Sequence, residues 1–355
     1  MKILIVGAGL GGLAAAYCFA KDGHHVFERR EKLSPKGSGL LIRPGASRIL
    51  QSWGLGDAIE QVADTCLPIL IRDLKTGKDK IRALPASFTK YPDWGIHRPI
   101  LQDILYQHAV HAGAEIFFNS SIEDFSDEPG EFDTCVWAGE ERFVIGRKPR
   151  KMEFWSGLFG LKHDDGHASM WSEDGDIAFV RQRFEGICPP LSAVLKLATK
   201  CDRWKIAQMP NLPRWTSRTG RTILLGDSAH AMEPNAAQGL SQIIEDIGVL
   251  HILLLSLPYL SVSVISRFWE DIRKPRVERI KSFAAWNTQR FLGHKDYGAS
   301  HQKYADTDWE SIKDIEPDPA ADFRSPAFFK WAHDYDVVEH TRKYLVKVNT
   351  PSSRL

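Results

Sequence analysis

The sequence has few cysteines and no excess of charge of one sign. Its five cysteines include no CxxC pair; they are Cys18, Cys66, Cys135, Cys188 and Cys201. Neither a disulfide framework nor a cysteine-based zinc site is expected, and a reducing, cytoplasmic location is the default. Lys and Arg total 46 against 45 Asp and Glu, a formal net charge of +1. This balance gives no indication of a nucleic-acid partner.

The sequence also lacks a clear targeting signal or membrane span. The apolar start, residues 1–6, is followed at once by glycines rather than by a cleavage site. Residues 247–266 are the most apolar stretch, but they contain His251, Pro258 and several serines. We therefore expect a core helix ending near Pro258, a turn, and a second helix running through 267–279, with no integral membrane segment. Association with a membrane surface stays open.

The composition is that of a globular protein. The chain has 355 residues, of which 43% are apolar and 26% charged. This length allows a sizeable core and about two domains.

The N-terminus carries a strand–turn–helix–strand pattern. Residues 2–6 are apolar and β-branched, residues 13–22 read as an Ala-rich helix, and residues 24–30 read as a second strand. The turn between the first strand and the helix fits G-x-G-x-x-G at Gly7, Gly9 and Gly12. Such a turn lets the backbone approach a pyrophosphate at a helix N-terminus.

The same pattern predicts which residues hold a dinucleotide. The phosphate-binding candidates are Gly7, Gly9, Leu10 and Gly12. Glu28 lies about 20 residues beyond the first glycine, where an acid accepts hydrogen bonds from ribose hydroxyls, and Arg29 beside it is a further cofactor-binding candidate. Because Glu28 repels a 2′-phosphate, FAD or NAD is favoured over NADP at this site.

A second informative segment lies in the C-terminal half. Residues 222–225 read as a short strand that leads into Gly226-Asp227, and a helix follows over 243–255. Such a strand presents the Asp227 carboxylate at the ligand edge of a sheet, and the later helix N-terminus offers N–H donors. Asp227 alone could equally be a turn or capping residue.

The segment from Gly226 to Leu250, GDSAHAMEPNAAQGLSQIIEDIGVL, resembles the GD motif of the group A FAD-dependent monooxygenases, the para-hydroxybenzoate and salicylate hydroxylase-like family, in its fungal form. The resemblance implies that Asp227 bonds the ribityl chain of FAD and that Pro234 lies beside the isoalloxazine. It also implies that the backbone around Gly239 and Leu240 faces the flavin N1/O2 edge.

Shorter segments carry the same resemblance. Residues 37–42, which include Gly39, look like the family's segment near the flavin, and residues 96–105 look like its H-R-x-x-L helix start. By that likeness Arg98 reaches the FAD phosphate or ribityl region. Residues 273–276 resemble the family's R-x-x-R helix, and residues 335–338 its C-terminal Y-D-V ending.

One motif of the family is missing. An Asp-Gly within G-A-D-G-x-x-S-x-x-R is expected near residues 139–147, and it is absent there. Asp165-Gly166 and Asp174-Gly175 occur in contexts that read as hairpin turns. The stretch between Arg98 and Asp227 is also shorter than is usual in the family, in which it encodes most of the substrate-binding sheet. Catalytic residues therefore cannot be assigned from the sequence.

We expect an α/β fold with a Rossmann-like FAD-binding domain of the glutathione-reductase type. An inserted, shortened β-sheet substrate domain and C-terminal helices complete it. The FAD-binding domain is predicted over 1–70, 96–145 and 215–290, the substrate domain over 71–95 and 146–214, and the helical region over 291–355.

The resemblance implies an FAD-dependent monooxygenase. Such an enzyme uses NAD(P)H as a transient reductant and O2 to hydroxylate or epoxidise an aromatic or electron-rich small molecule through a flavin C4a-hydroperoxide, often in secondary metabolism. The alternatives are a flavoprotein of this fold with rearrangement, oxidase or reduced activity, a non-enzymatic FAD-binding protein, and a plain NAD-dependent dehydrogenase. The sequence indicates no metal and leaves the oligomeric state open.

Overall fold

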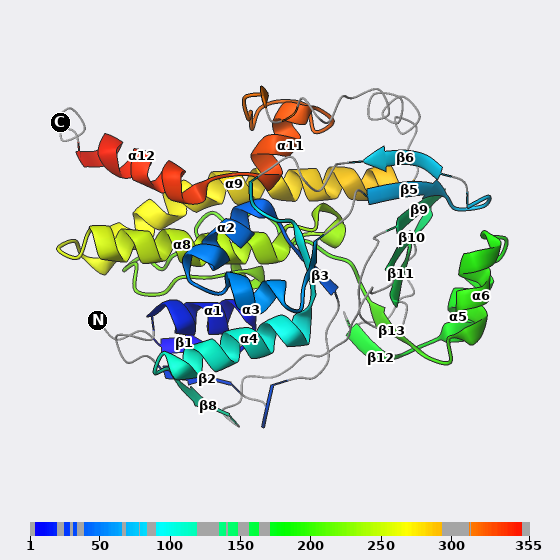
Figure 1. Ribbon diagram of the computed structural model, residues 1–355, viewed down its shortest axis with the longest axis horizontal. Helices are drawn as coiled ribbons and strands as arrows, with labels where there is room; N and C mark the ends of the chain where they lie inside the picture. The colour runs from blue at the N-terminus through cyan, green and yellow to red at the C-terminus, as the bar shows by residue number, and fades with distance from the viewer. Residues whose placement is uncertain are drawn as a thin grey trace.

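The computed structural model describes residues 4–19, 25–28, 31–33, 39–65, 69–77, 79–83, 90–118, 135–139, 141–147, 156–162, 171–292, 312 and 314–349 (Figure 1).

The N-terminal unit is a parallel sheet with helices. Strand β1 (Leu4–Val6) pairs in parallel with β2 (His25–Phe27), which pairs in parallel with β8 (Glu115–Phe117). Parallel neighbours require a crossover, and helix α1 (Leu10–Phe19) provides it. Helix α1 packs against α4 (Arg98–His111), which leads into β8. The predicted strand–helix–strand unit is confirmed, although the helix begins three residues earlier than expected.

A second, antiparallel sheet follows in the chain. Strand β3 (Gly39–Ile42) pairs with β7 (Trp94–His97), and β7 pairs with β4 (Asp64–Thr65). Helix α2 (Pro44–Ser52) and helix α3 (Gly56–Glu60) connect β3 to β4.

A separate five-stranded sheet has the order β11-β10-β9-β5-β6. Its strands are β5 (Ile69–Asp73), β6 (Asp79–Ala83), β9 (Cys135–Gly139), β10 (Arg142–Arg147) and β11 (Ser156–Leu161). Strands β5 and β9 are parallel and the other pairs are antiparallel.

Two segments pair with strands that the proposed domain division assigns to the other domain. Residues 135–139 and 142–145, which we expected in the FAD-binding domain, pair into the five-stranded sheet. Residues 94–95, which we expected in the substrate domain, pair with β3 instead. Partner strands that are distant in the chain decide both pairings, and the division into domains stays a proposal.

A small helical and β layer borders that sheet. It consists of β12 (Trp171–Gly175), α5 (Ile177–Arg183), α6 (Pro189–Leu197) and β13 (Cys201–Trp204). Asp174-Gly175 is the end of β12 and pairs with β13 through a register shift, so its interpretation as a hairpin turn is wrong. Asp165-Gly166 lies outside the described residues.

The C-terminal half is mainly helical. Its elements are α7 (Asp227–His230), the 3-10 helix η2 (Pro234–Ala236), α8 (Gly239–Ser256), α9 (Val262–Phe291), α11 (Pro326–His333) and α12 (Val337–Asn349). The predicted turn near Pro258 is confirmed. The predicted strand over 222–225 is not, because in the described residues this stretch makes only an isolated bridge between Ile223 and Thr216.

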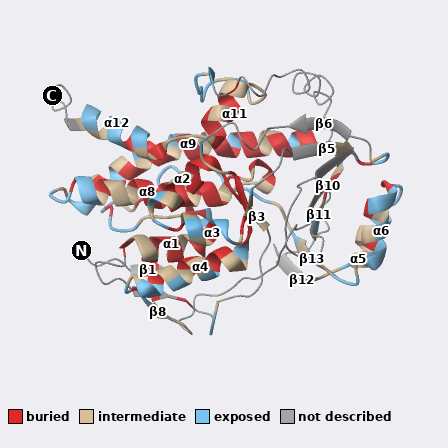
Figure 2. Cartoon of the chain, in the orientation of Figure 1, coloured by how far each residue is buried: buried red, intermediate tan, exposed pale blue. Residues whose placement is uncertain are grey.

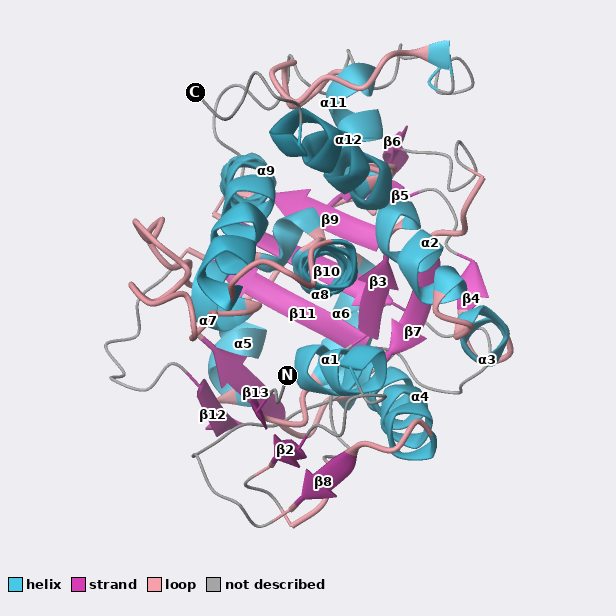
Figure 3. Cartoon of the chain, turned by 90° about the vertical axis from the view of Figure 1, so that its left-hand side faces the viewer, coloured by secondary structure: helices cyan, strands magenta, loops and turns pink. Residues whose placement is uncertain are grey.

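Helix α8 forms the centre of the molecule. Most of its residues are apolar, and its buried residues also include the polar Gln242, Glu245 and Asp246. It packs against α1, α2, α9, α12 and β3, and Figure 3 shows it end-on among these elements. Helix α8 is long and apolar enough to cross a membrane by length and composition, but Figure 2 shows that much of it is buried within the protein. We therefore interpret it as a core helix.

Candidate functional site: a glycine-rich turn and a buried ionic network

The glycine-rich turn leaves open space beside the N-terminus of α1. Gly7 has φ +93°, a left-handed backbone that favours glycine, and a Cβ atom added at Gly7 or Gly9 would meet no other atom within 4 Å. At Gly12 an added Cβ would lie 1.9 Å from the Gly7 carbonyl oxygen. Gly12 thus permits close packing of helix and strand, while Gly7 and Gly9 border a free space. The first N–H groups of α1, from Leu10 onward, have no partner within the helix.

Glu28 faces this turn. Its carboxylate accepts a hydrogen bond from the Ala8 N–H at 2.7 Å, and Glu28 is buried. From the other side, the Gln102 amide on α4 donates to the Ala8 carbonyl at 2.7 Å. The Ala8 peptide is therefore clamped between two polar side chains. Gln102 was missed by sequence reasoning, because a glutamine inside a helix carries no motif signal.

The Gly-Asp segment lies next to the glycine-rich turn. One side chain of α8, Ile243, joins the two motifs. A Cβ added at Gly11 would lie 3.0 Å from Ile243 Cγ2, and one added at Gly226 would lie 3.1 Å from Ile243 Cγ1. Gly226 has φ +63°, and the exposed Asp227 follows it as the first residue of α7.

The predicted flavin edge is the start of α8. Gly239 is the first residue of this helix, and a Cβ added there would also point into open space. Leu240 is buried, and Pro234 begins η2 just upstream. Ala237 between them has φ +51°, which costs a non-glycine residue of the order of 1 kcal/mol. Strained backbone of this kind is common at functional sites.

The remaining predicted residues are less informative. Gly39 is the first residue of β3, which packs against α8. Arg98 is the first residue of α4 and is exposed. Arg29 lies outside the described residues. The structure thus brings Gly7, Gly9, Gly12 and Glu28 together, and it places the Gly-Asp segment beside them through Ile243.

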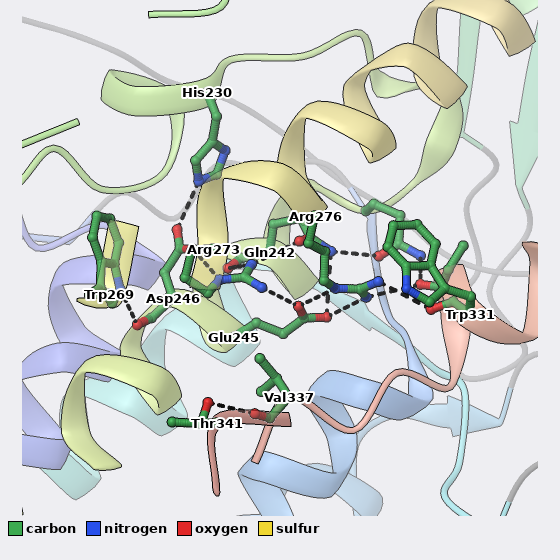
Figure 4. Close-up of polar contacts among 12 residues, drawn as sticks. His230, Gln242, Glu245, Asp246, Trp269, Arg273, Arg276, Trp331, Val337 and Thr341 are labelled. Carbon is green, nitrogen blue, oxygen red and sulfur yellow. Dashed lines mark hydrogen bonds and ion pairs between the residues drawn. The ribbon is translucent and has the colours of Figure 1, made fainter. Parts of the chain in front are cut away.

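A buried ionic network supports this site (Figure 4). Arg273 on α9 donates to Asp246 and to Glu245, both at 2.7 Å, and to the Gln242 side chain at 2.8 Å. Arg276 bonds the same Glu245 through two nitrogens, at 2.7 and 2.8 Å. All five side chains are buried. Although burial opposes ionisation, the charges of Arg273 and His230 hold the pKa of Asp246 below its usual value.

The network ties α7 and α11 to α8. His230, three residues after Asp227 on α7, contacts Asp246 through Nε2 at 2.8 Å. Arg276 donates to the carbonyls of Trp331 and Ala332 at the end of α11, at 3.1 and 3.2 Å. Glu245 and Asp246 lie in the segment that resembles the GD motif, and Arg273 and Arg276 lie in the R-x-x-R segment, but the spacing of these segments did not show that they meet.

Asn235, beside Pro234, presents an acceptor without a partner. The residue is 8% exposed, and its Oδ1 atom has no hydrogen-bond partner. Its Nδ2 donates to Thr288 Oγ1 at 2.6 Å, and its backbone carbonyl accepts from Asn287 at 3.1 Å. Because Nδ2 is directed at α9, Oδ1 points away from Thr288. An unpaired buried acceptor costs about 1–3 kcal/mol unless a ligand donates to it.

Acid should weaken the fold through His333 on α11. Burial, and secondarily the charge of Arg43, lowers the pKa of His333 from 6.5 to about 3. Below about pH 6.5 the unfolded chain therefore binds a proton that the folded chain refuses until about pH 3. Unfolding free energy should fall with decreasing pH across this window, by at most about 1.4 kcal/mol per pH unit for this group.

Urea unfolding of wild type and His333→Phe at pH 8, 6 and 5 tests this expectation. The variant should depend less on pH, with residual dependence from His97, whose pKa burial lowers to about 4. His111→Gln, on the exposed side of α4, is the control. An unchanged pH dependence in His333→Phe would contradict the assignment.

The comparisons with known proteins agree with this geometry. A family model described as FAD binding domain matches residues 1–142. The FAD-dependent monooxygenase OpS4 of Beauveria bassiana is 25% identical over 414 aligned positions, covering 95% of this chain and 96% of OpS4. Because 414 exceeds the 355 residues here, OpS4 has segments that this chain lacks.

Solved structures share the fold. CtdE in complex with FAD and substrate 4 superposes with a TM-score of 0.75 at 19% identity, covering 98% of this chain and 100% of CtdE. A salicylate hydroxylase substrate complex gives 0.70 at 14% identity, covering 96% and 97%. The chain is therefore similar along nearly its whole length to FAD-dependent monooxygenases of the hydroxybenzoate and salicylate hydroxylase type, and its first 142 residues match the FAD binding domain family.

Proposed function

We propose that this protein is an FAD-dependent monooxygenase that uses NAD(P)H and O2 to hydroxylate or epoxidise an aromatic or electron-rich small molecule, in cytoplasmic secondary metabolism. The proposal is carried by two observations on the glycine-rich turn, the Gly-Asp segment and the start of α8. Gly7, Gly9 and Gly239 border open space, and Ile243 joins the glycine-rich turn to the Gly-Asp segment. The proposal is supported by the FAD binding domain match and the monooxygenase relatives.

The chain's own residues have separable roles in this proposal. Gly7, Gly9, Leu10 and Gly12 receive the pyrophosphate at the start of α1, and Glu28 accepts hydrogen bonds from ribose hydroxyls. Asp227 binds the ribityl chain, Arg98 contributes positive charge at the phosphate or ribityl region, and Pro234 with the Gly39 segment borders the ring. Bound FAD supplies the redox chemistry with O2. The N-terminus of α8, at Gly239 and Leu240, stabilises negative charge on the ring edge.

Replacing Asp227 with Ala should weaken FAD binding about 10- to 100-fold, because a hydrogen bond to a charged group contributes about 1.5–3 kcal/mol. Asp227 is exposed, so the apoprotein should fold as the wild type does. Titrating apoprotein with FAD measures the effect, and Asp103→Ala, an exposed carboxylate on α4, is the matched control. Equal FAD affinity in both variants would remove Asp227 from the site.

Asn235 should favour substrates that carry an N–H or O–H donor. If Oδ1 accepts from the substrate, Asn235→Leu should weaken binding of such a compound about tenfold and leave FAD binding unchanged. Indole and benzofuran, which differ by one N–H, serve as paired probes, read by perturbation of the flavin spectrum. The wild type should prefer indole and the variant should not. A preference for indole that survives in Asn235→Leu would contradict this role.

The alternative is a flavoprotein of the same fold that performs a rearrangement or acts as an oxidase. The missing Asp-Gly motif favours this alternative. The segments that OpS4 has and this chain lacks favour it too, if they belong to the substrate domain.

The visible spectrum and nicotinamide oxidation separate these functions. The purified protein should be yellow and should oxidise NADPH or NADH faster when a suitable aromatic compound is added. A colourless protein that FAD cannot reconstitute would refute both proposals. A yellow protein that neither nicotinamide reduces would favour the alternative.

A further inference from the structure

One end of the molecule carries a cluster of exposed apolar side chains. Seven large apolar side chains are exposed in the described part of the chain, and four lie here; their exposed fractions are 69% for Leu255, 71% for Tyr259, 37% for Val262 and 67% for Val346. We call these four residues the apolar tip. They lie at the end of α8, in the turn that follows it, at the start of α9 and near the end of α12 (Figure 1, left).

Specific contacts bring these segments together. The Tyr344 ring of α12 lies 5.7 Å from Phe268 of α9, and its hydroxyl donates to Asp271 at 3.3 Å. Helices α9 and α12 run in opposite directions in Figure 1, so the turn after Tyr344, which holds Val346, lies toward the start of α9. The loop before the Gly-Asp segment reaches the same end, since a Cβ added at Gly220 would lie 2.5 Å from the Ser263 Cα.

Exposed basic side chains outnumber exposed acidic ones on the segments that carry the apolar tip. Six exposed basic side chains lie on these segments, namely Arg218, Arg221, Arg267, Arg342, Lys343 and Lys347. The exposed acidic residues on the same segments are Asp271 and Glu339. A chain whose net charge is only +1 thus concentrates cations at this end.

We propose that the apolar tip and the basic side chains of the same segments dock onto the surface of a membrane that contains anionic lipids. Aliphatic and tyrosine side chains enter the boundary between headgroups and acyl chains, and nearby Lys and Arg are attracted to anionic headgroups. In Figures 1 and 2 the turn between α8 and α9 and the end of α12 lie at one end of the molecule. Because α8 itself belongs to the core, the association is peripheral.

This surface is separate from the proposed FAD site. Helix α8 begins at Gly239, in the proposed FAD site, and ends at Ser256 beside the apolar tip. At 1.5 Å per residue the two ends are about 25 Å apart. The inference therefore does not depend on the proposed enzymatic activity.

Co-sedimentation of the full-length protein with vesicles tests the proposal. The protein should bind vesicles of phosphatidylcholine and phosphatidylserine at least tenfold more tightly than vesicles of phosphatidylcholine alone, and salt should reduce the difference. Leu255→Ser with Tyr259→Ser should lower binding to both vesicles at least tenfold. Lys343→Glu with Lys347→Glu should abolish the preference for phosphatidylserine.

Leu197→Ser is the matched control. Leu197 is 81% exposed on α6, away from the tip, so its replacement should leave vesicle binding unchanged. All variants alter exposed side chains and should keep the wild-type melting temperature. Absence of binding to either vesicle, an equal loss in Leu197→Ser, or retained binding in the Leu255/Tyr259 variant overturns the proposal. So does concentration-dependent dimerisation that the same double variant abolishes, because the tip would then face a second copy.

Discussion

Replacing Arg273 with Met should lower the free energy of unfolding by about 3–5 kcal/mol, since removing one partner of a buried ion pair leaves an uncompensated charge. Arg273 is 0% exposed and bonds Asp246, Glu245 and Gln242. Its loss leaves Glu245 with Arg276 and leaves Asp246 with His230. Because Asp246 also holds His230 of α7, FAD retention should decline with stability.

Urea unfolding provides the measurement, with Arg267→Met as control on the same helix. Arg267 is exposed and bonds only Ser263 in the contacts described, so its replacement should cost less than about 0.5 kcal/mol. Combining Arg273→Met with Asp246→Asn should cost less than the sum of the two single changes, because the double variant removes one charge of each sign. Equal losses for Arg273→Met and Arg267→Met would show that the network contributes little.

The local fold was predictable where one short segment decides its own structure. The β1–α1–β2 unit follows from three local features: a β-branched run, a tight turn whose backbone requires glycine, and an Ala-rich helix. The break between α8 and α9 follows from Pro258 and its neighbouring serines. These features depend on backbone sterics and residue spacing, both of which are visible in the sequence.

Strand pairing between segments distant in the chain could not be predicted from the sequence. Residues 135–139 and 142–145 are apolar enough for either sheet, and only their register with β5 and β11 places them in the five-stranded one. Residues 222–225 have the composition of a strand, yet a single bridge to Thr216 is formed. Short apolar runs do not encode their partner strands, so the sequence alone does not predict which sheet each run joins.

In the candidate site, too, local features were predictable and long-range contacts were not. Gly7, Gly9, Gly12 and Glu28 lie close together because one βαβ unit carries them all. The role of Ile243 and Gln102 depends on how α8 and α4 pack, which no motif records. The ionic network depends on contact between Glu245 on α8 and Arg273 on α9, two helices that are joined by a turn. Motif resemblance indicated these positions but gave no geometry.

Replacing Gly12 with Ala should destabilise the protein severely, whereas replacing Gly9 with Ala should weaken FAD binding and spare the fold. At Gly12 the new Cβ would lie 1.9 Å from the Gly7 carbonyl oxygen, so α1 and β1 would have to separate. The free energy of unfolding should fall by more than is typical of overpacking, which costs about 1–3 kcal/mol. At Gly9 the Cβ meets no atom within 4 Å and φ is not left-handed, so apoprotein stability should hold or rise by up to about 1 kcal/mol.

The two variants should also differ in FAD affinity. If the open space beside Gly9 is where the pyrophosphate lies, a methyl group there should raise the dissociation constant of FAD at least about 100-fold, or about 2.7 kcal/mol. Thermal unfolding of apoprotein and FAD titration measure the two effects independently. Wild-type FAD affinity in Gly9→Ala would place the cofactor elsewhere. A Gly12→Ala protein as stable as the wild type would show that helix and strand can part without cost, and the close packing assigned to this glycine would be wrong.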